Sequence, residues 1–446
     1  MQRHTAIDYL VSDAMNLVKI LCAALLWLGF LCEPATAQDT IRINGSNTLG
    51  DRMVPILVEG WMKKIGYGNI IRTPAKGGRI KIGARRDDET LIVEISGNGS
   101  RAGFQDLVTG GTEIAMMSRA LSVQEIDDGW QLGSLNSPDQ EHVIGLQAMT
   151  VIVHPSNRVT GLDMIQLSKI IAGQITDWRQ VGGKPGPIRL HIARQGTGLA
   201  ELQASILPGR VTAGNIERHG NAKAIRATVA ADPNSLGIDE FSVVTDRYRV
   251  LPMRVAGRLI PADHLHIKAE DYPLMRRLYF YTGQIVTALG RGFLLYAESD
   301  EGQRLLASHG YLSLAPMLFA ETGRKDLPTE YSQWTEGASR LSFSFRFGNA
   351  FSIFDSRGAQ DLARLKDFMR RPENKNRKVI LVGHSDKQSS AYIASSVSNE
   401  YADLVATALT EIGINPMRVR GVGYTLPLSS AGNAVYRNRR VEIWVR

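Results

Sequence analysis

The chain has 446 residues, of which 43% are hydrophobic and 22% are charged, and its formal net charge is +8. This composition is ordinary for a globular protein and excludes a largely disordered chain, a collagen-like fibre and a disulfide-dense mini-protein. A protein with several membrane spans is also excluded, because the sequence contains only one long apolar stretch. At roughly 150 residues per domain, the length predicts about three structural units.

The N-terminal segment has the pattern of a secretory signal peptide. Lys19 precedes an apolar run over residues 20–31, and the small residues Ala35 and Ala37 follow that run. The run is shorter than the roughly 20 residues that a membrane-spanning helix needs. We therefore expect export and cleavage after Ala37, with an uncleaved membrane anchor as the alternative.

The same segment decides how the two cysteines are interpreted. Cys22 and Cys32 both lie in the part that cleavage would remove, so we expect a mature protein without thiols or disulfides. Cysteine-based metal sites, redox chemistry and thiol nucleophiles are then excluded. The residues before Met15 include two aspartates, which are unusual in a signal peptide, and the sequence leaves open whether Met1 or Met15 is the start.

The positive charge is concentrated in the last quarter of the chain. Residues 338–446 hold 17 basic and 9 acidic side chains, whereas residues 38–337 hold 33 and 32. For an exported protein we expect no nucleic-acid partner. The basic part fits cell-wall carboxylates or lipid phosphates as partners, and a solubilising surface is an equal alternative.

From residue 40 to about residue 320, short β-rich apolar runs alternate with helical stretches. Strands are expected at residues 41–43, 91–95, 114–117 and 149–153, and helices at residues 51–64 and from about Phe104 onward. Such alternation predicts an α/β fold. A second pattern of strands and helices begins at residue 340 and runs to the last residue.

Three loops rich in glycine and small polar residues each lie between a predicted strand and a predicted helix. They cover residues 44–50, 96–103 and 194–198. Glycine lets the backbone approach a ligand, helix N-termini offer unpaired N–H donors, and Ser, Thr and Arg add further donors. Three such loops in one place would bind an oxyanion without a metal, whereas each loop alone is equally typical of an N-cap and turn.

Together these loops and their surroundings resemble the phosphate-binding proteins of bacterial ABC transporters, the PstS-like family. The matching segments are GSNTLG from residue 45, GSRAGFQDLVTGGTEIAMMSRALS from residue 99, and further along VIVHPSN and ADPNSLGIDEF. The resemblance covers roughly residues 40–315 and implies two α/β lobes joined by crossing segments, as in type II-like periplasmic binding proteins. The ligand would lie between the lobes, and binding would close them by a hinge motion.

The resemblance also implies a set of ligand-binding residues. They are Ser46, Asn47, Thr48, Ser100, Ser118, Arg119, Arg194, Gly196 and Thr197. Two departures from the family pattern bear on selectivity. Arg119 stands where well-known members have an Asp that accepts a proton from phosphate, and Arg cannot accept one. The third loop lacks the family's serine, so the choice among phosphate, another oxyanion and an acidic organic ligand stays open.

The C-terminal segment resembles the OmpA-like peptidoglycan-binding domain. The resemblance rests on VGHSD, which ends at Asp386, on the helical pattern after it, and on RGVGYTLPL and NRRVEIWV near the C-terminus. It implies an OmpA-like α+β sandwich that docks on the peptide stem of peptidoglycan. The expected order is a signal peptide at residues 1–37, a binding domain at 38–321, a linker at 322–339 and an OmpA-like domain at 340–446.

In the OmpA-like family, an Asp and an Arg 15 residues later hold the zwitterionic end of diaminopimelate. Asp386 is present, but Tyr401 stands at the position of the Arg, and Tyr cannot form a charged fork to a carboxylate. Asn438 and Arg440 match the end of the family motif, with a structural role as the alternative for Arg440. We therefore expect peptidoglycan binding that is weakened, altered or lost.

Nothing in the sequence indicates catalysis, a cofactor or a metal. GxSxG, P-loop and HExxH motifs are absent, and His264 and His266 have no partners at metal-ligand spacing. We therefore expect a non-enzymatic, periplasmic solute-binding protein for phosphate or a related oxyanion, associated with the cell wall or outer membrane. Its further partner would be an ABC permease or an envelope sensor. The alternative is a structural, peptidoglycan-associated protein whose first domain is an interaction module.

Overall fold

A long strand, β6 (Glu141–Val153), joins two lobes that share an 11-stranded β-sheet. Its first half pairs with β14 (Met275–Thr282) and its second half with β10 (Ser235–Glu240), so the strand crosses from one lobe to the other. The predicted strand at residues 149–153 is therefore too short. Gly145 interrupts the apolar run before residue 149, but the strand continues through it and is buried along nearly its whole length.

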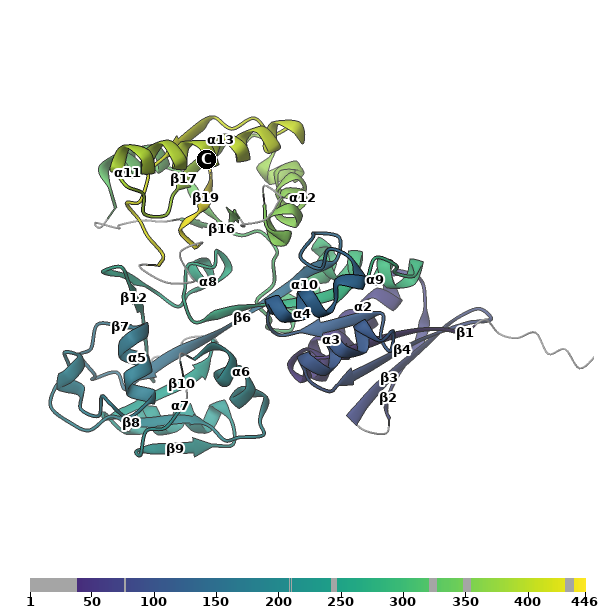
Figure 1. The fold of residues 1–446 in the computed structure, drawn as a ribbon, viewed down its shortest axis with the longest axis horizontal. Helices are drawn as coiled ribbons and strands as arrows, with labels where there is room; N and C mark the ends of the chain where they lie inside the picture. The colour runs from purple at the N-terminus through teal and green to yellow at the C-terminus, as the bar shows by residue number, and fades with distance from the viewer. Residues whose placement is uncertain are drawn as a thin grey trace, which may run out of the picture.

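The computed structural model describes residues 38–75, 78–207, 209, 211–241, 247–320, 327–347, 354–429 and 437–446. The expected signal peptide and both cysteines therefore lie outside the described residues. Figure 1 shows three bodies: a purple-to-blue lobe, a teal lobe, and a green-to-yellow body packed over both. Within the described ranges, no helix is long and apolar enough to cross a membrane.

The first lobe carries the strand order β2-β3-β4-β1-β5-β14, which continues into β6. Its remaining strands are β1 (Gln38–Gly45), β2 (Gly68–Ala75), β3 (Arg79–Arg86), β4 (Glu89–Gly97) and β5 (Ile114–Met117). Its helices are the π-helical turn η1 (Leu49–Met53), α2 (Val54–Lys64), α3 (Ser100–Val108), α4 (Val123–Asp128), the turn η3 (Trp130–Leu132), α9 (Ala288–Glu298) and α10 (Asp300–Ser308). The strand expected at residues 114–117 is confirmed, and the helix expected from about Phe104 begins four residues earlier.

The second lobe continues the sheet in the order β6-β10-β8-β9, with β11 also paired to β6. Its other strands are β7 (Leu162–Asp163), β8 (Arg189–Ala193), β9 (Ile216–His219), β11 (Arg249–Leu251), β12 (Met253–Val255) and β13 (Arg258–Ile260). Its helices are α5 (Met164–Ile171), η4 (Trp178–Val181), α6 (Gly198–Ile206), α7 (Ala222–Ala231) and α8 (His264–Lys268). Leu190 and Ile192 of β8 point to one face of the sheet and pack in the main core of this lobe.

The C-terminal body is a five-stranded sheet in the order β15-β16-β19-β17-β18. Its strands are β15 (Leu318–Ala320), β16 (Ser339–Arg346), β17 (Val379–His384), β18 (Arg418–Gly421) and β19 (Arg440–Val445). Its helices are α11 (Thr329–Thr335), α12 (Ser356–Arg370), the turn η5 (Pro372–Asn374) and α13 (Ala391–Glu411). Leu365 of α12 and Val405 and Leu409 of α13 bury their side chains against this sheet.

The segment between the binding domain and the C-terminal body is part of the C-terminal fold. β15 precedes the expected linker at residues 322–339, yet it pairs with β16 of the C-terminal sheet. The described part of that segment contains α11, whose Tyr331 is buried against Trp444. The polar sequence of this segment shows no helical apolar pattern, because only Tyr331 and a few neighbours face the core.

A buried ionic cluster fixes the C-terminal body to the binding domain just after α8. Glu270 accepts hydrogen bonds from Arg277 Nε and Nη2 at 2.6 and 2.8 Å, and it also contacts Arg357 of α12. Asp271 pairs with Arg340 of β16 at 2.8 Å. Burial opposes ionisation of Glu270, but attraction to Arg277 and Arg357 outweighs it and holds the pKa of Glu270 well below 4.5. The C-terminal body therefore contacts the binding domain through ion pairs at the segment where the chain returns from the second lobe to the first.

Candidate functional site

The first two predicted loops meet at the carboxyl ends of neighbouring parallel strands. β1 pairs in parallel with both β4 and β5, so the three strands end at one edge of the sheet. Asn98 and Gly99 donate backbone N–H bonds to the Gly45 carbonyl at 2.9 and 2.8 Å, and Ser46 donates one to the Met116 carbonyl at 2.7 Å. These bonds hold the loops after β1, β4 and β5 side by side.

Hydroxyl groups from these segments lie close together at the same edge. The Ser118 N–H donates to Ser100 Oγ at 3.2 Å, and the Oγ atoms of the two serines are 3.3 Å apart. Ser46 is buried, and Asn47 and Thr48 are half-buried beside it. The structure thus brings together the predicted site residues of the first lobe except for the Arg119 side chain.

Two helices begin at this edge and direct their N-termini toward the loops. Helical backbone starts at Asn47, passes through the π-helical turn η1 and continues into α2, while α3 starts at Ser100. The first-turn N–H groups of a helix have no partner within the helix, and the helix dipole makes this end positive. An anion placed here would meet hydroxyl and backbone donors together.

Close backbone packing explains why glycines flank this site. A Cβ atom on Gly103 of α3 would lie 2.4 Å from Gly45 Cα, and one on Gly45 would lie 2.1 Å from the Met116 carbonyl oxygen. Neither distance is tolerated between a side chain and backbone. Glycine is therefore required where α3 crosses the end of β1.

The third predicted loop joins β8 to α6 in the second lobe. Thr197 is the N-cap of α6, because its Oγ1 accepts the Ala200 N–H at 3.2 Å. The same hydroxyl donates to the Arg194 carbonyl at 2.8 Å. Gly196 has a φ of +80°, and both Gly196 and Arg194 are exposed. The loop thus leaves a helix N-terminus and a cationic side chain accessible.

One hydrogen bond links the first loop to the second lobe. Asn47 Nδ2 donates to Glu201 Oε1 at 3.4 Å, and Glu201 lies in the first turn of α6. This contact places the first and third loops face to face across the lobes. No local sequence pattern indicates Glu201, because its proximity to Asn47 depends on how the lobes face each other.

Arg119 forms an ion pair with α4 in the first lobe. Its Nη1 and Nη2 atoms bond both carboxylate oxygens of Glu125 at 2.6 and 2.7 Å. Hydrogen bonding from Arg119 lowers the pKa of Glu125 to about 2 despite its partial burial. Arg119 and Glu125 line a surface hollow of about 680 Å³ between α3 and α4. The positive charge that Arg119 was expected to bring to the anion site is thus paired with Glu125.

In the C-terminal body, Asp386 is paired with an arginine that the sequence analysis did not select. Arg439 Nε and Nη2 donate to Asp386 Oδ2 at 3.0 and 2.9 Å, and Gln388 donates to Asp386 Oδ1 at 2.8 Å. Tyr401 stacks on Phe347 with ring centroids 4.3 Å apart. Burial raises the pKa of Tyr401, so its hydroxyl stays neutral.

Asn438 and Arg440 occupy interior positions with protein partners. Asn438 Oδ1 accepts from the backbone N–H groups of Leu428 and Ser429 at 2.6 and 3.1 Å. Arg440 donates to Glu442 Oε1 at 2.8 Å and to the Leu426 carbonyl at 3.1 Å. These contacts support the structural role that the sequence analysis named as the alternative for Arg440, and they give Asn438 the same role.

Family comparisons agree with this two-part architecture. Residues 84–301 match the family described as the PBP superfamily domain, and residues 345–440 match the OmpA family. The phosphate-binding protein PstS of Borreliella burgdorferi is 31% identical over 240 residues, which cover 50% of this chain and 80% of that protein. The chain belongs to the PstS-like family. Its C-terminal part is an OmpA family domain.

Other PstS-like proteins show more distant similarity. PstS of Bacillus subtilis is 23% identical over 227 residues, covering 50% of this chain and 72% of that protein. The crystal structure of an ABC-type phosphate transport receptor from Vibrio cholerae is 21% identical, with a TM-score of 0.49, and the match covers 61% of this chain and 99% of that chain. The family match confirms the predicted mixed α/β binding-protein fold followed by an OmpA domain.

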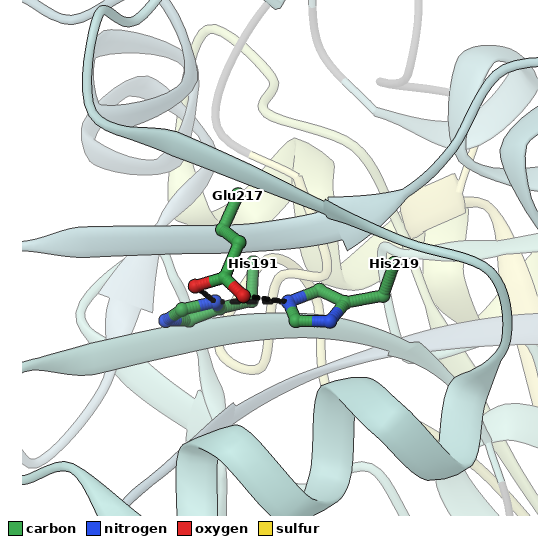
Figure 2. A group of neighbouring side chains, drawn as sticks. All are labelled: His191, Glu217 and His219. Atoms are coloured by element: carbon green, nitrogen blue, oxygen red, sulfur yellow. Dashed lines mark hydrogen bonds and ion pairs between the residues drawn. The ribbon is translucent and has the colours of Figure 1, made fainter.

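This PstS-like chain also contains a cluster of side chains that the sequence analysis missed. His191 of β8 and Glu217 and His219 of β9 point toward one another in the second lobe (Figure 2). Glu217 and His219 are two residues apart on a short strand, so they share a face. His191 joins these two side chains only because β8 pairs with β9, and no sequence motif encodes the register of that pairing.

Proposed function

We propose that this PstS-like chain is an exported, periplasmic solute-binding protein for phosphate or a related oxyanion, held at the cell wall or outer membrane by its OmpA domain. The convergence of loop hydroxyls and two helix N-termini at the ends of β4, β1 and β5 carries this proposal. Membership of a binding-protein family also favours a non-enzymatic role. The names of its relatives, which are phosphate-binding proteins, suggest the ligand class.

We assign the two roles to different parts of the chain. Residues 38–321 would hold the anion and residues 340–446 would contact the envelope, while the described part of the connecting segment 322–339 packs with the C-terminal body through α11. The ligand contacts would come from Ser46, Asn47, Thr48, Ser100, Ser118, Arg194, Gly196 and Thr197. Arg119 would contribute only if an anion displaced it from Glu125.

Calorimetric titration tests the anion-binding proposal. The chain from Gln38 to the C-terminus would be titrated with phosphate, sulfate and small organic acids, and we expect one anion to bind with one-to-one stoichiometry. Ser100→Ala removes a hydroxyl donor and should weaken binding by about 10- to 100-fold, the worth of one hydrogen bond to a charged group. Ser308→Ala, at an exposed serine of α10, is the matched control and should bind as the parent does. Absence of heat with every anion would contradict the proposal.

We further propose that envelope contact depends on Asp386 and is weak in this chain. Arg439 already holds Asp386, and Tyr401 supplies no charge for a ligand carboxylate. Co-sedimentation with isolated peptidoglycan tests this. Tyr401→Arg should increase the bound fraction and Asp386→Asn should reduce it, whereas Asp403→Asn, at an exposed carboxylate of α13, should change nothing. If neither the parent nor Tyr401→Arg sediments, wall anchoring by this domain is wrong.

One observation favours the alternative of a structural envelope protein whose first domain is an interaction module. The C-terminal body grips Glu270 and Asp271, next to the segments that cross between the lobes. If the crossing segments form the hinge, these contacts with the C-terminal body oppose the lobe closure that solute capture requires. Solution scattering with and without phosphate separates the two roles, because capture predicts a decrease in the radius of gyration and a structural module predicts none.

A further inference from the structure

The missed cluster in the second lobe has the donor set of a transition-metal site. His191 of β8 is the register partner of Glu217 in the parallel strand β9, and Ala193 is the partner of His219. Alternation along β9 places Glu217 and His219 on one face, and His191 lies opposite them on the same face. Figure 2 shows the two imidazole rings and the carboxylate converging on one point.

The donor atoms lie at separations close to those between the ligands of a tetrahedral zinc ion, with the two histidines facing different oxygens of Glu217. His191 Nδ1 lies 3.1 Å from His219 Nε2 and 3.5 Å from a carboxylate oxygen of Glu217, and His219 Nε2 lies 3.7 Å from the other oxygen. Four ligands at 2.0 to 2.1 Å from a zinc ion are separated by roughly 3.3 to 3.4 Å. Small side-chain rotations would therefore bring all three donors onto one ion.

A hydrogen-bond chain behind His191 fixes which ring nitrogen faces the cluster. Ser235 Oγ donates to Asp232 Oδ2 at 3.1 Å, so its oxygen is left to accept from His191 Nε2–H at 2.9 Å. His191 Nδ1 then carries the lone pair that faces His219 and Glu217. Such outer hydrogen bonds orient histidine ligands in metal sites.

Burial and exposure within the cluster also suit a bound cation. The imidazole rings of His191 and His219 are buried. The Glu217 side chain is 62% exposed and gives an ion access from solvent. Without a metal, His219 Nε2–H can donate to His191 Nδ1, which satisfies these two nitrogen atoms.

We propose that His191, Glu217 and His219 bind a divalent transition metal, with zinc as the best fit. Two imidazoles and one carboxylate suit zinc and its neighbours, whereas calcium and magnesium prefer sites made of oxygen atoms. Three protein ligands leave a fourth position for water or another ligand. The Arg194 N–H donates to the His219 carbonyl at 2.7 Å, so the metal would stabilise the strand end beside the third loop. This inference does not depend on anion binding.

Metal titration of the chain from Gln38 tests the proposal. After removal of metals with a chelator, Zn²⁺ would be titrated in competition with a chromophoric chelator, and Co²⁺ would be followed by its visible absorption. We expect one tight equivalent of Zn²⁺ and intense tetrahedral Co²⁺ bands. Glu217→Gln and His219→Gln should each weaken Zn²⁺ binding at least tenfold, because even outer-shell changes cost about 10- to 100-fold.

Two matched controls make the result specific. Arg218→Gln changes the residue between the two β9 ligands, and His309→Gln removes an exposed histidine elsewhere. Both variants should keep one tight Zn²⁺ equivalent and the Co²⁺ bands. Circular dichroism would check that Glu217→Gln is folded, as its exposure leads us to expect. Equal Zn²⁺ affinity in the parent and His219→Gln, or loss of the tight equivalent in His309→Gln, would overturn the proposal.

Discussion

At the residue scale, Glu201 is the side chain that we expect to affect anion selectivity most. It approaches Asn47 from the other lobe and brings a carboxylate to the first loop, whereas Arg119 stands at the sequence position of the family's proton acceptor. A carboxylate repels a fully ionised anion but accepts a hydrogen bond from a protonated phosphate. We therefore expect Glu201 to have opposite effects on the binding of sulfate and of phosphate.

The first prediction concerns Glu201→Gln. If Glu201 accepts the phosphate proton, the variant should lose phosphate affinity by about tenfold or more, the worth of a charged hydrogen bond, and should gain sulfate affinity. Calorimetric titration with both anions at neutral pH measures this. Glu411→Gln, at an exposed glutamate of α13 in the C-terminal body, is the control and should leave both anion affinities unchanged. An equal rise in affinity for both anions would show that Glu201 only repels anions and does not accept the phosphate proton.

A second residue-scale prediction concerns pH and His384. Burial, aided by the nearby charge of Arg440, lowers the pKa of this histidine to about 4. The unfolded chain takes up the proton first, near pH 6.5, so the stability that depends on neutral His384 is present above that pH and is lost as the pH falls toward 4. The melting temperature of the parent should therefore drop over this range.

Comparison with His384→Gln isolates this contribution. Its melting temperature should fall less between pH 7 and pH 4.5 than that of the parent, because one proton-linked transition is removed. His309→Gln, at an exposed histidine, should follow the parent curve. Parallel curves for the parent and His384→Gln would contradict the assignment.

At the element scale, the crossing of α3 over the end of β1 positions the first-lobe site. Gly103 allows the contact with Gly45, and the resulting packing places the N-terminus of α3 beside Ser46. We predict that Gly103→Ala destabilises the chain by about 1 to 3 kcal/mol through overpacking and also weakens anion binding. Urea unfolding and calorimetry measure the two effects.

The control for this change lies on β3, which β4 separates from β1 in the sheet. A Cβ atom on Gly83 of β3 would meet no atom within 4 Å, so Gly83→Ala should leave both stability and anion binding nearly unchanged. Stability of Gly103→Ala equal to that of Gly83→Ala would show that the crossing is wider than the structure indicates.

At the scale of the whole molecule, the buried ionic cluster makes the C-terminal body and the binding domain one packed unit. Arg357 is buried between Glu270 and Asp361, whereas Arg371 forms a half-exposed pair with Asp300 at 3.0 Å. Removing one partner of a buried ion pair leaves uncompensated charge and costs about 3 to 5 kcal/mol, while an exposed pair contributes about 1 kcal/mol or less.

The same substitution at both positions tests this difference. Arg357→Met should lower the free energy of unfolding by several kcal/mol and Arg371→Met by about 1 kcal/mol or less. Urea denaturation followed by tryptophan fluorescence provides the measurement. Similar small losses in both variants would mean that the C-terminal body is only loosely attached.

Local sequence patterns were sufficient for much of this protein. Apolar alternation predicted the strand at residues 114–117, and glycine-rich loops after strands predicted where Ser46 and Ser100 would lie. Motif order also predicted the two families, which the comparisons confirm. These features succeed because each is specified by residues that are close together in the chain.

Only the tertiary structure decided the features that depend on distant pairs. The contact of Glu201 with Asn47, the pairing of Arg439 with Asp386, and the meeting of His191 with His219 each join separate elements. Such contacts depend on strand register and domain packing. The periodic spacing of apolar residues in a strand or helix does not encode either of these. The sequence thus determined the families, the order of the parts and the location of the loops, and the packing of those parts decided which charges and donors face one another.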